Sequence, residues 1–118
     1  MSDAFTSYVG LIHDIEHIPL VAKEAPRLSP QERGLVTARV LDFVREQVVP
    51  QAEREEEAAD GLFYEHGLIT RRAEELARVD VSDGVRVEML LYELHGAIAR
   101  HFAEAELMVS SLWEDGAA

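Results

Sequence analysis

The sequence predicts an all-α protein, an antiparallel up-down-up-down four-helix bundle that forms a single domain over residues 1–118. Three observations predict this fold class. Apolar residues recur at three- and four-residue spacing in four segments, and no segment alternates convincingly with the period of two that strands show. Short breaks rich in proline, glycine and aspartate separate the segments, and short connections favour antiparallel neighbours. A chain of 118 residues can bury one compact core rather than two.

The first helix is predicted over residues 3–25, and it ends at a break over residues 26–30 that begins and ends with proline. It carries His13 and His17, whose i,i+4 spacing could place both imidazoles at one cation. Apolar residues run nearly all round this helix, so the periodicity leaves open which histidine points inward. Pro19 predicts a kink or break close to the same level.

The second helix is predicted over residues 30–60, with Ser29 as its N-cap and Pro30 at its first position. A stripe of apolar residues continues with the same spacing onto Gln51 and Glu55; its apolar members are Leu41, Val44 and Val48. A carboxylate that faces a bundle interior is costly unless it is paired or bound to metal. The alternative is that the end of this helix emerges into water.

A break near Asp60-Gly61 precedes the third helix, which is predicted over residues 62–79. This helix carries His66 close to three apolar side chains, Leu62, Phe63 and Ile69. The break over residues 80–84 follows, with Ser82 or Asp83 predicted to cap the last helix.

The last helix is predicted over residues 84–113. His101 interrupts an apolar stripe made of Val87, Leu91, Leu94, Ile98, Ala105, Met108 and Leu112. It is either a satisfied core histidine or a metal ligand. On an ideal helix Glu104 lies about 60° to one side of His101 and Glu106 about 140° to the other. A π-bulge would turn Glu106 toward the histidine, whereas His95 is predicted to flank the site.

The composition narrows the function classes. With 23 acidic against 11 basic side chains and a net charge of −12, the surface repels phosphate backbones and anionic lipid, so no nucleic-acid or membrane partner is predicted. A long apolar run and a secretion-type start are both missing, so we expect a cytoplasmic protein. The absence of cysteine leaves histidine, carboxylate or amide as metal ligands. No nucleophile constellation or Gly-rich phosphate loop favours an enzyme.

Three segments carry a family resemblance. Residues 94–106 place Glu106 five positions after His101, residues 49–56 contain Gln51-Ala52-Glu53-Arg54-Glu55, and residues 65–69 read Glu65-His66-Gly67-Leu68-Ile69. With these motifs the chain resembles the hemerythrin-like, or HHE cation-binding, family over most of its length.

The resemblance implies ligation by Glu55, His66, His101 and Glu106, together with His13 or His17 from the first helix. A shift of one residue in the alignment would instead put Asp14 at the first-helix position. The implied cofactor is non-haem iron, one or two ions bridged by the carboxylates. The implied partner is dioxygen or a related small molecule, nitric oxide or peroxide, bound for sensing, storage or protection. Imidazole and carboxylate ligands with open positions suit iron.

Two departures from the family pattern leave an alternative. Gln51 stands where the family has a histidine, and Thr70 stands where hemerythrins proper have a second one in the third helix. An amide carbonyl and a neutral hydroxyl are weak ligands. The alternative is a degenerate, metal-poor bundle that acts as a protein-interaction or dimerisation module, for instance as a homodimer that uses Leu112 and Trp113.

Overall fold

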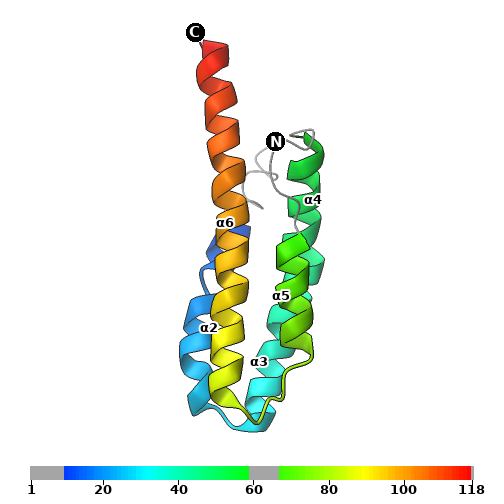
Figure 1. Cartoon of the computed structure of the whole chain (residues 1–118). Coiled ribbons are helices and arrows are strands. Elements are labelled where there is room, and N and C mark those ends of the chain that lie inside the picture. Colours follow the sequence, from blue (N-terminus) through cyan, green and yellow to red (C-terminus); the bar gives the residue numbers. More distant parts are fainter. Residues whose placement is uncertain (1–9, 59–66, 118) are drawn as a thin grey trace.

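The computed structural model describes residues 10–58 and 67–117, with the backbone alone described for residue 58 and for residues 104–117. Every regular element in these ranges is helical, which confirms the all-α class (Figure 1). Four arms run in alternating directions in Figure 1. The first comprises residues 10–15, α2 (Ile18–Glu24) and the 3-10 turn η1 (Ala25–Arg27). The second comprises α3 (Pro30–Phe43), the π-helix η2 (Val44–Val48) and α4 (Val49–Ala58). The third is α5 (Gly67–Ala77) and the fourth α6 (Gly84–Ala117).

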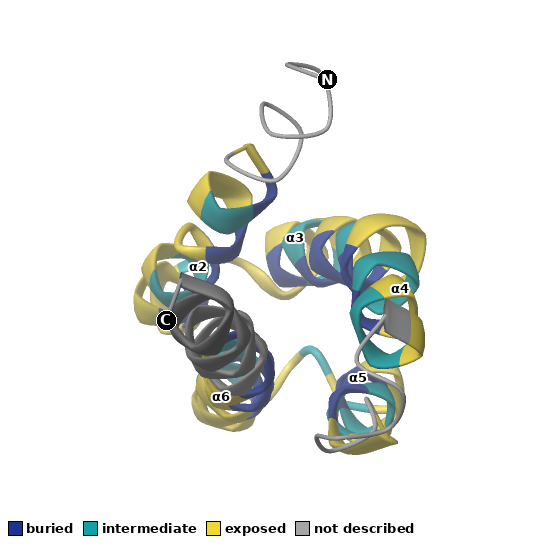
Figure 2. Cartoon of the chain, turned by 90° about the horizontal axis from the view of Figure 1, so that it is seen from above, coloured by how far each residue is buried: buried dark blue, intermediate teal, exposed yellow. Residues whose placement is uncertain are grey.

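The core lies where α6 packs against α2 and α5, and where α3 packs against α5. Figure 2 shows the buried sides of these helices turned toward a common interior. The predicted stripe of the last helix is confirmed as far as side chains are described, because four aliphatic members and the histidine within it are buried: Val87, Leu91, Leu94, Ile98 and His101. The helical periodicity therefore identified the inward face of α6 correctly.

The first arm breaks where Pro19 predicted. Residues Glu16 and His17 form a turn, and α2 begins at Ile18 with the proline in its first turn. Because proline has no N–H and a fixed φ, it is well accommodated there and poorly accommodated farther into a helix. The backbone N–H of His17 bonds to the carbonyl of Asp14 at 3.1 Å, a three-residue step that tightens the chain at this point.

The second arm begins with the predicted cap. The Ser29 hydroxyl accepts a hydrogen bond from the backbone N–H of Glu32 at 3.2 Å. In return the Glu32 carboxylate accepts one from the Ser29 N–H at 3.1 Å. This capping box satisfies two N–H groups that the first helical turn leaves without partners, and Pro30 occupies a position that needs none.

A π-turn at Val44–Val48 joins α3 to α4, and Pro50 explains it. In a regular α-helix Pro50 would offer no N–H to the carbonyl of Glu46, and its ring would collide with that carbonyl. The chain widens before the proline instead, so that the Val49 N–H bonds to the Val44 carbonyl. The last helix has no such π-turn to bring Glu106 round toward His101, because α6 is α-helical from Gly84 to Ala117.

The last connection matches its predicted position. Asp83 caps α6, since its carboxylate accepts a hydrogen bond from the backbone N–H of Arg86 at 3.0 Å. Ser82 bonds to Asp80 instead, through both its N–H and its hydroxyl. The helix ends at Ala117 rather than near residue 113. Within the described ranges, none of the helices has both the length and the apolar character needed to cross a bilayer.

Arg33 joins two connections at one end of the bundle, although its side chain is charged and buried (8% exposed). Its guanidinium donates to the carbonyl of Leu28 from Nε at 3.1 Å and from Nη2 at 2.8 Å. It also donates to the carbonyl of Val81, which lies 48 residues away in the sequence. The planar fork of arginine suits such multiple acceptors.

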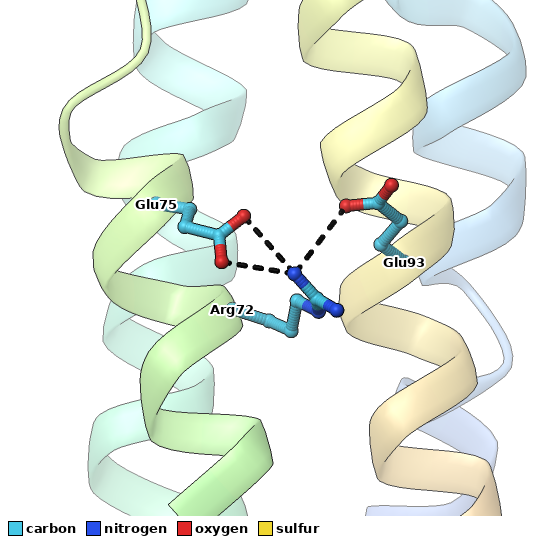
Figure 3. Close-up of polar contacts among 3 residues, drawn as sticks. All are labelled: Arg72, Glu75 and Glu93. Carbon is cyan, nitrogen blue, oxygen red and sulfur yellow. Dashed lines mark hydrogen bonds and ion pairs between the residues drawn. The ribbon is translucent and has the colours of Figure 1, made fainter.

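A second arginine links the third and fourth arms on the surface. Arg72 of α5 contacts both carboxylate oxygens of Glu75, at 2.9 and 3.2 Å, and lies 3.9 Å from the carboxylate of Glu93 on α6 (Figure 3). All three side chains are at least one-third exposed, so the network contributes little to the free energy of folding. Its contribution is to favour one alignment of α5 against α6.

Two glycines of α6 give a matched test of how the start of this helix packs against Pro26 and Arg33. A Cβ at Gly84 would lie 3.0 Å from Pro26 Cα and 3.1 Å from the Arg33 guanidinium, whereas a Cβ at Gly96 would meet nothing within 4 Å. We expect Gly84→Ala to lower the free energy of unfolding by about 1–3 kcal/mol through overpacking. Gly96→Ala is expected to raise it by about 0.5–1 kcal/mol because alanine favours the helix. Urea denaturation of both variants measures this, and equal effects of the same sign would contradict the packing described.

Candidate functional site

The π-turn sets which residues of α4 face the interior. After Val44 and Val48 the buried position is Ala52, so that the stripe advances in four-residue steps rather than along the predicted line. Gln51, Glu55 and Glu56 lie on either side of Ala52 along the chain and are half-buried. The second arm therefore brings two carboxylates, rather than one, to the edge of the interior.

Glu55 is held in an asymmetric environment. Its Oε1 accepts a hydrogen bond from the Gln51 amide at 3.2 Å, whereas its Oε2 is buried and has no hydrogen-bond partner. Arg54 bonds to the other end of the same amide at 2.6 Å, so Gln51 is oriented by one charged neighbour and orients the other. Burial raises the pKa of the Glu55 carboxyl, and the Gln51 hydrogen bond and the Arg54 charge oppose that shift without cancelling it.

Glu56 was not selected by the sequence analysis. One of its carboxylate oxygens is buried in the structure. Heptad spacing passed from Gln51 to Glu55, but the π-turn adds one residue and rotates the following face toward Glu56 as well. Pro50 is the signal that could have found it, because a proline this far inside a helix requires a local change of backbone pairing.

His101 is the buried histidine of the structure's described residues, with a side chain only 5% exposed and its Nε2 buried. The ring of Phe102 stands edge-on to it, with centroids 5.4 Å apart. Its helix contacts α4, which lies alongside the middle of α6 in Figure 1. Imidazole nitrogen and carboxylate oxygen thus come from two helices in contact.

The histidines of the first arm have a different place. Both His13 and His17 are exposed, so the structure brings neither of them to the interior. Asp14, the alternative ligand, is exposed too. The remaining two predicted ligands, His66 and Glu106, lie outside the residues whose side chains the structure describes.

His95, which was predicted to flank the site, lies at the edge of the interior. It is half-buried, and its Nε2 lies 3.8 Å from a carboxylate oxygen of Glu16 in the first arm. Thr70 is also half-buried, on α5. It lines a mainly apolar, solvent-open cavity of about 190 Å³ together with Val44, Arg45, Val49, Ala73 and Glu74. This cavity includes none of the predicted ligands.

The described donors do not form a complete metal centre by themselves. Among side chains that the structure describes, no three histidine, aspartate or glutamate residues are grouped closely enough to hold a metal ion. Glu55 and His101 would therefore need further donors.

No protein-family model, curated protein or solved structure matches this chain significantly.

Proposed function

We propose that the chain is a hemerythrin-like protein that binds one or two non-haem iron ions between α4 and α6, with dioxygen, nitric oxide or peroxide as the small molecule it senses, stores or removes. Two of the proposed ligands, Glu55 and His101, belong to the part of the chain whose side chains the structure describes. His66 and Glu106 complete the set through the family resemblance. The exposed His13 and His17 are not included.

The observation that carries the proposal is the buried Oε2 of Glu55, which has no hydrogen-bond donor. An acceptor of this kind costs free energy when it is left unpaired, and more when it is ionised. A cation would compensate it. The buried oxygen of Glu56 adds a second carboxylate at the same end of α4. Carboxylate and imidazole together suit iron, zinc and manganese, and iron is the metal that the resemblance implies.

The chain's own residues would position and protect the metal. The Gln51 amide donates a hydrogen bond to one oxygen of Glu55 and so fixes the direction of the other oxygen. Hydrogen bonds of this kind commonly orient metal ligands. Fully buried aliphatic residues precede each ligand on its own arm, Val48 before Glu55 and Ile98 before His101, and would keep water from that side. Bound iron would supply an open coordination position for the small molecule.

Anaerobic reconstitution with iron tests the proposal. We expect the wild-type chain to retain iron after desalting, and His101→Leu and Glu55→Gln each to lower iron affinity by about tenfold or more. Leucine fills the histidine's space without a ligating nitrogen, and circular dichroism checks that both variants fold. His13→Ala and Glu57→Gln change exposed side chains and are the matched controls. Equal iron retention in all five proteins would refute the site.

One observation favours the second candidate, a metal-poor bundle that acts as an interaction or dimerisation module. Gln51 already occupies one oxygen of Glu55 with a hydrogen bond, as it would if it had replaced a ligand. On this view the wild-type chain takes up no iron, and a chelator leaves its melting temperature unchanged. Glu55→Gln would then be neutral or stabilising, because it removes a half-buried charge.

A further inference from the structure

The exposed His13 and His17 lie close together. Their ring centroids are 4.7 Å apart, and the ring planes meet at 75°. A zinc ion binds imidazole nitrogen at about 2.0–2.1 Å, so two imidazoles on one ion, at an angle of about 90–110°, have centroids roughly 4.5–5.2 Å apart. The pair already has the separation that a shared ion requires.

We propose that His13 and His17 form a second metal site, a solvent-facing chelate for a divalent transition-metal ion such as Zn²⁺. This site is separate from the buried one and does not depend on it. Two imidazoles four residues apart on a helix are a recurring zinc-binding arrangement, and the chain keeps the two rings close here although it turns at His17. The formal charge of −12 raises the local concentration of cations around such a site.

The site would be open rather than enclosed. Within the part of the chain that the structure describes, no third histidine or carboxylate groups with the pair. Water or a small ligand would therefore fill the remaining coordination positions, as in zinc sites with exchangeable ligands.

The position of Glu16 distinguishes this site from the catalytic zinc site of a peptidase. Residues 13–17 have the spacing His-x-x-Glu-His, which in some zinc peptidases supplies two ligands and a general base. Here the carboxylate of Glu16 lies 3.8 Å from His95 Nε2 on α6, which turns it toward the fourth arm. The structure thus assigns metal binding alone to His13 and His17, with no general base beside the ion.

Binding would also brace the first arm. His13 lies in the helix of residues 10–15, and His17 lies in the turn that follows it. An ion held by both histidines would therefore bridge the break before α2. An ion that binds only the folded state stabilises it by mass action. The melting temperature should therefore rise with Zn²⁺ concentration.

Calorimetric titration of the chelator-treated full chain with Zn²⁺ tests the site. His101→Leu serves as the parent, because it removes the buried imidazole. We expect one Zn²⁺ per chain in this parent and an affinity at least tenfold lower when His13→Ala or His17→Ala is added. Glu24→Gln, an exposed change at the far end of α2, should leave the affinity unchanged. In the parent, Zn²⁺ should raise the melting temperature, and in the double histidine variant it should not.

Three results would overturn the inference: no Zn²⁺ binding by the parent at millimolar concentration, unchanged affinity in the double variant, or loss of iron from a chain that lacks only His13 and His17. The last result would assign these histidines to the buried site. If the wild-type chain takes up no iron while the parent still binds Zn²⁺ through this pair, the proposed function fails and the surface site stands.

Discussion

Arg33→Ala is expected to lower the free energy of unfolding by about 2–4 kcal/mol, because hydrogen bonds from a charged, buried donor are among the stronger ones in proteins. The substitution removes all the guanidinium's bonds to the carbonyls of Leu28 and Val81 at once. It also leaves space beside Gly84, whose Cα faces the guanidinium. Urea denaturation followed by circular dichroism measures the effect.

Two further variants define the cause. Arg39→Ala removes an exposed arginine from the same helix and is expected to change the free energy of unfolding by less than about 0.5 kcal/mol. Arg33→Lys keeps the charge but lacks the planar fork, so it should recover only part of the loss. If Arg33→Ala were no more harmful than Arg39→Ala, the buried guanidinium would not hold the two connections together.

Leu91→Ala should have an effect of similar size for a different reason. Leu91 is fully buried on α6, and truncation of such a leucine costs about 3–5 kcal/mol, through lost transfer free energy and the cavity that remains. Leu35→Ala makes the same chemical change on α3, where the side chain is 60% exposed, and should cost less than about 1 kcal/mol. Thermal unfolding of both proteins, side by side, checks this.

The two leucine variants test the four-arm arrangement directly. If Leu91→Ala and Leu35→Ala shifted the midpoint by the same amount, the inward face of α6 would be assigned wrongly. The predicted stripe on that helix would then fail as well, because it assigns Leu91 to the core through the same periodicity.

Local signals in the sequence were sufficient for most element ends. Ser29 and Pro30 start α3, Asp83 caps α6, and Pro19 follows the break in the first arm, because each of these residues acts on backbone groups a few positions away. Arg33 was beyond such reasoning. Its burial depends on a carbonyl 48 residues away, and no local pattern distinguishes it from an exposed arginine of the same helix.

The candidate site was predictable to a smaller extent. His101 interrupts a clean apolar stripe, so its burial followed from periodicity, whereas for Glu55 the sequence left both an inward and a solvent-facing position open and the structure shows it half-buried. The first arm gave no such guidance, because its apolar residues surround the helix and the turn before α2 changes the facing of what precedes it. That both of its histidines face solvent could therefore not be predicted.

The π-turn has a consequence for how this end of the bundle can change. A π-turn holds about one residue more than an α-turn, and Pro50 is what prevents a regular helix here, so Pro50→Ala would let the arm return to regular α-helix with its residue count unchanged. The same residues would then turn about 100° farther, and everything beyond them would rotate by that amount relative to α3. Ala52 would leave the core, and the two buried carboxylate oxygens would leave the edge of the interior. Pro50, which is not itself a candidate ligand, thus decides which side chains of α4 face inward.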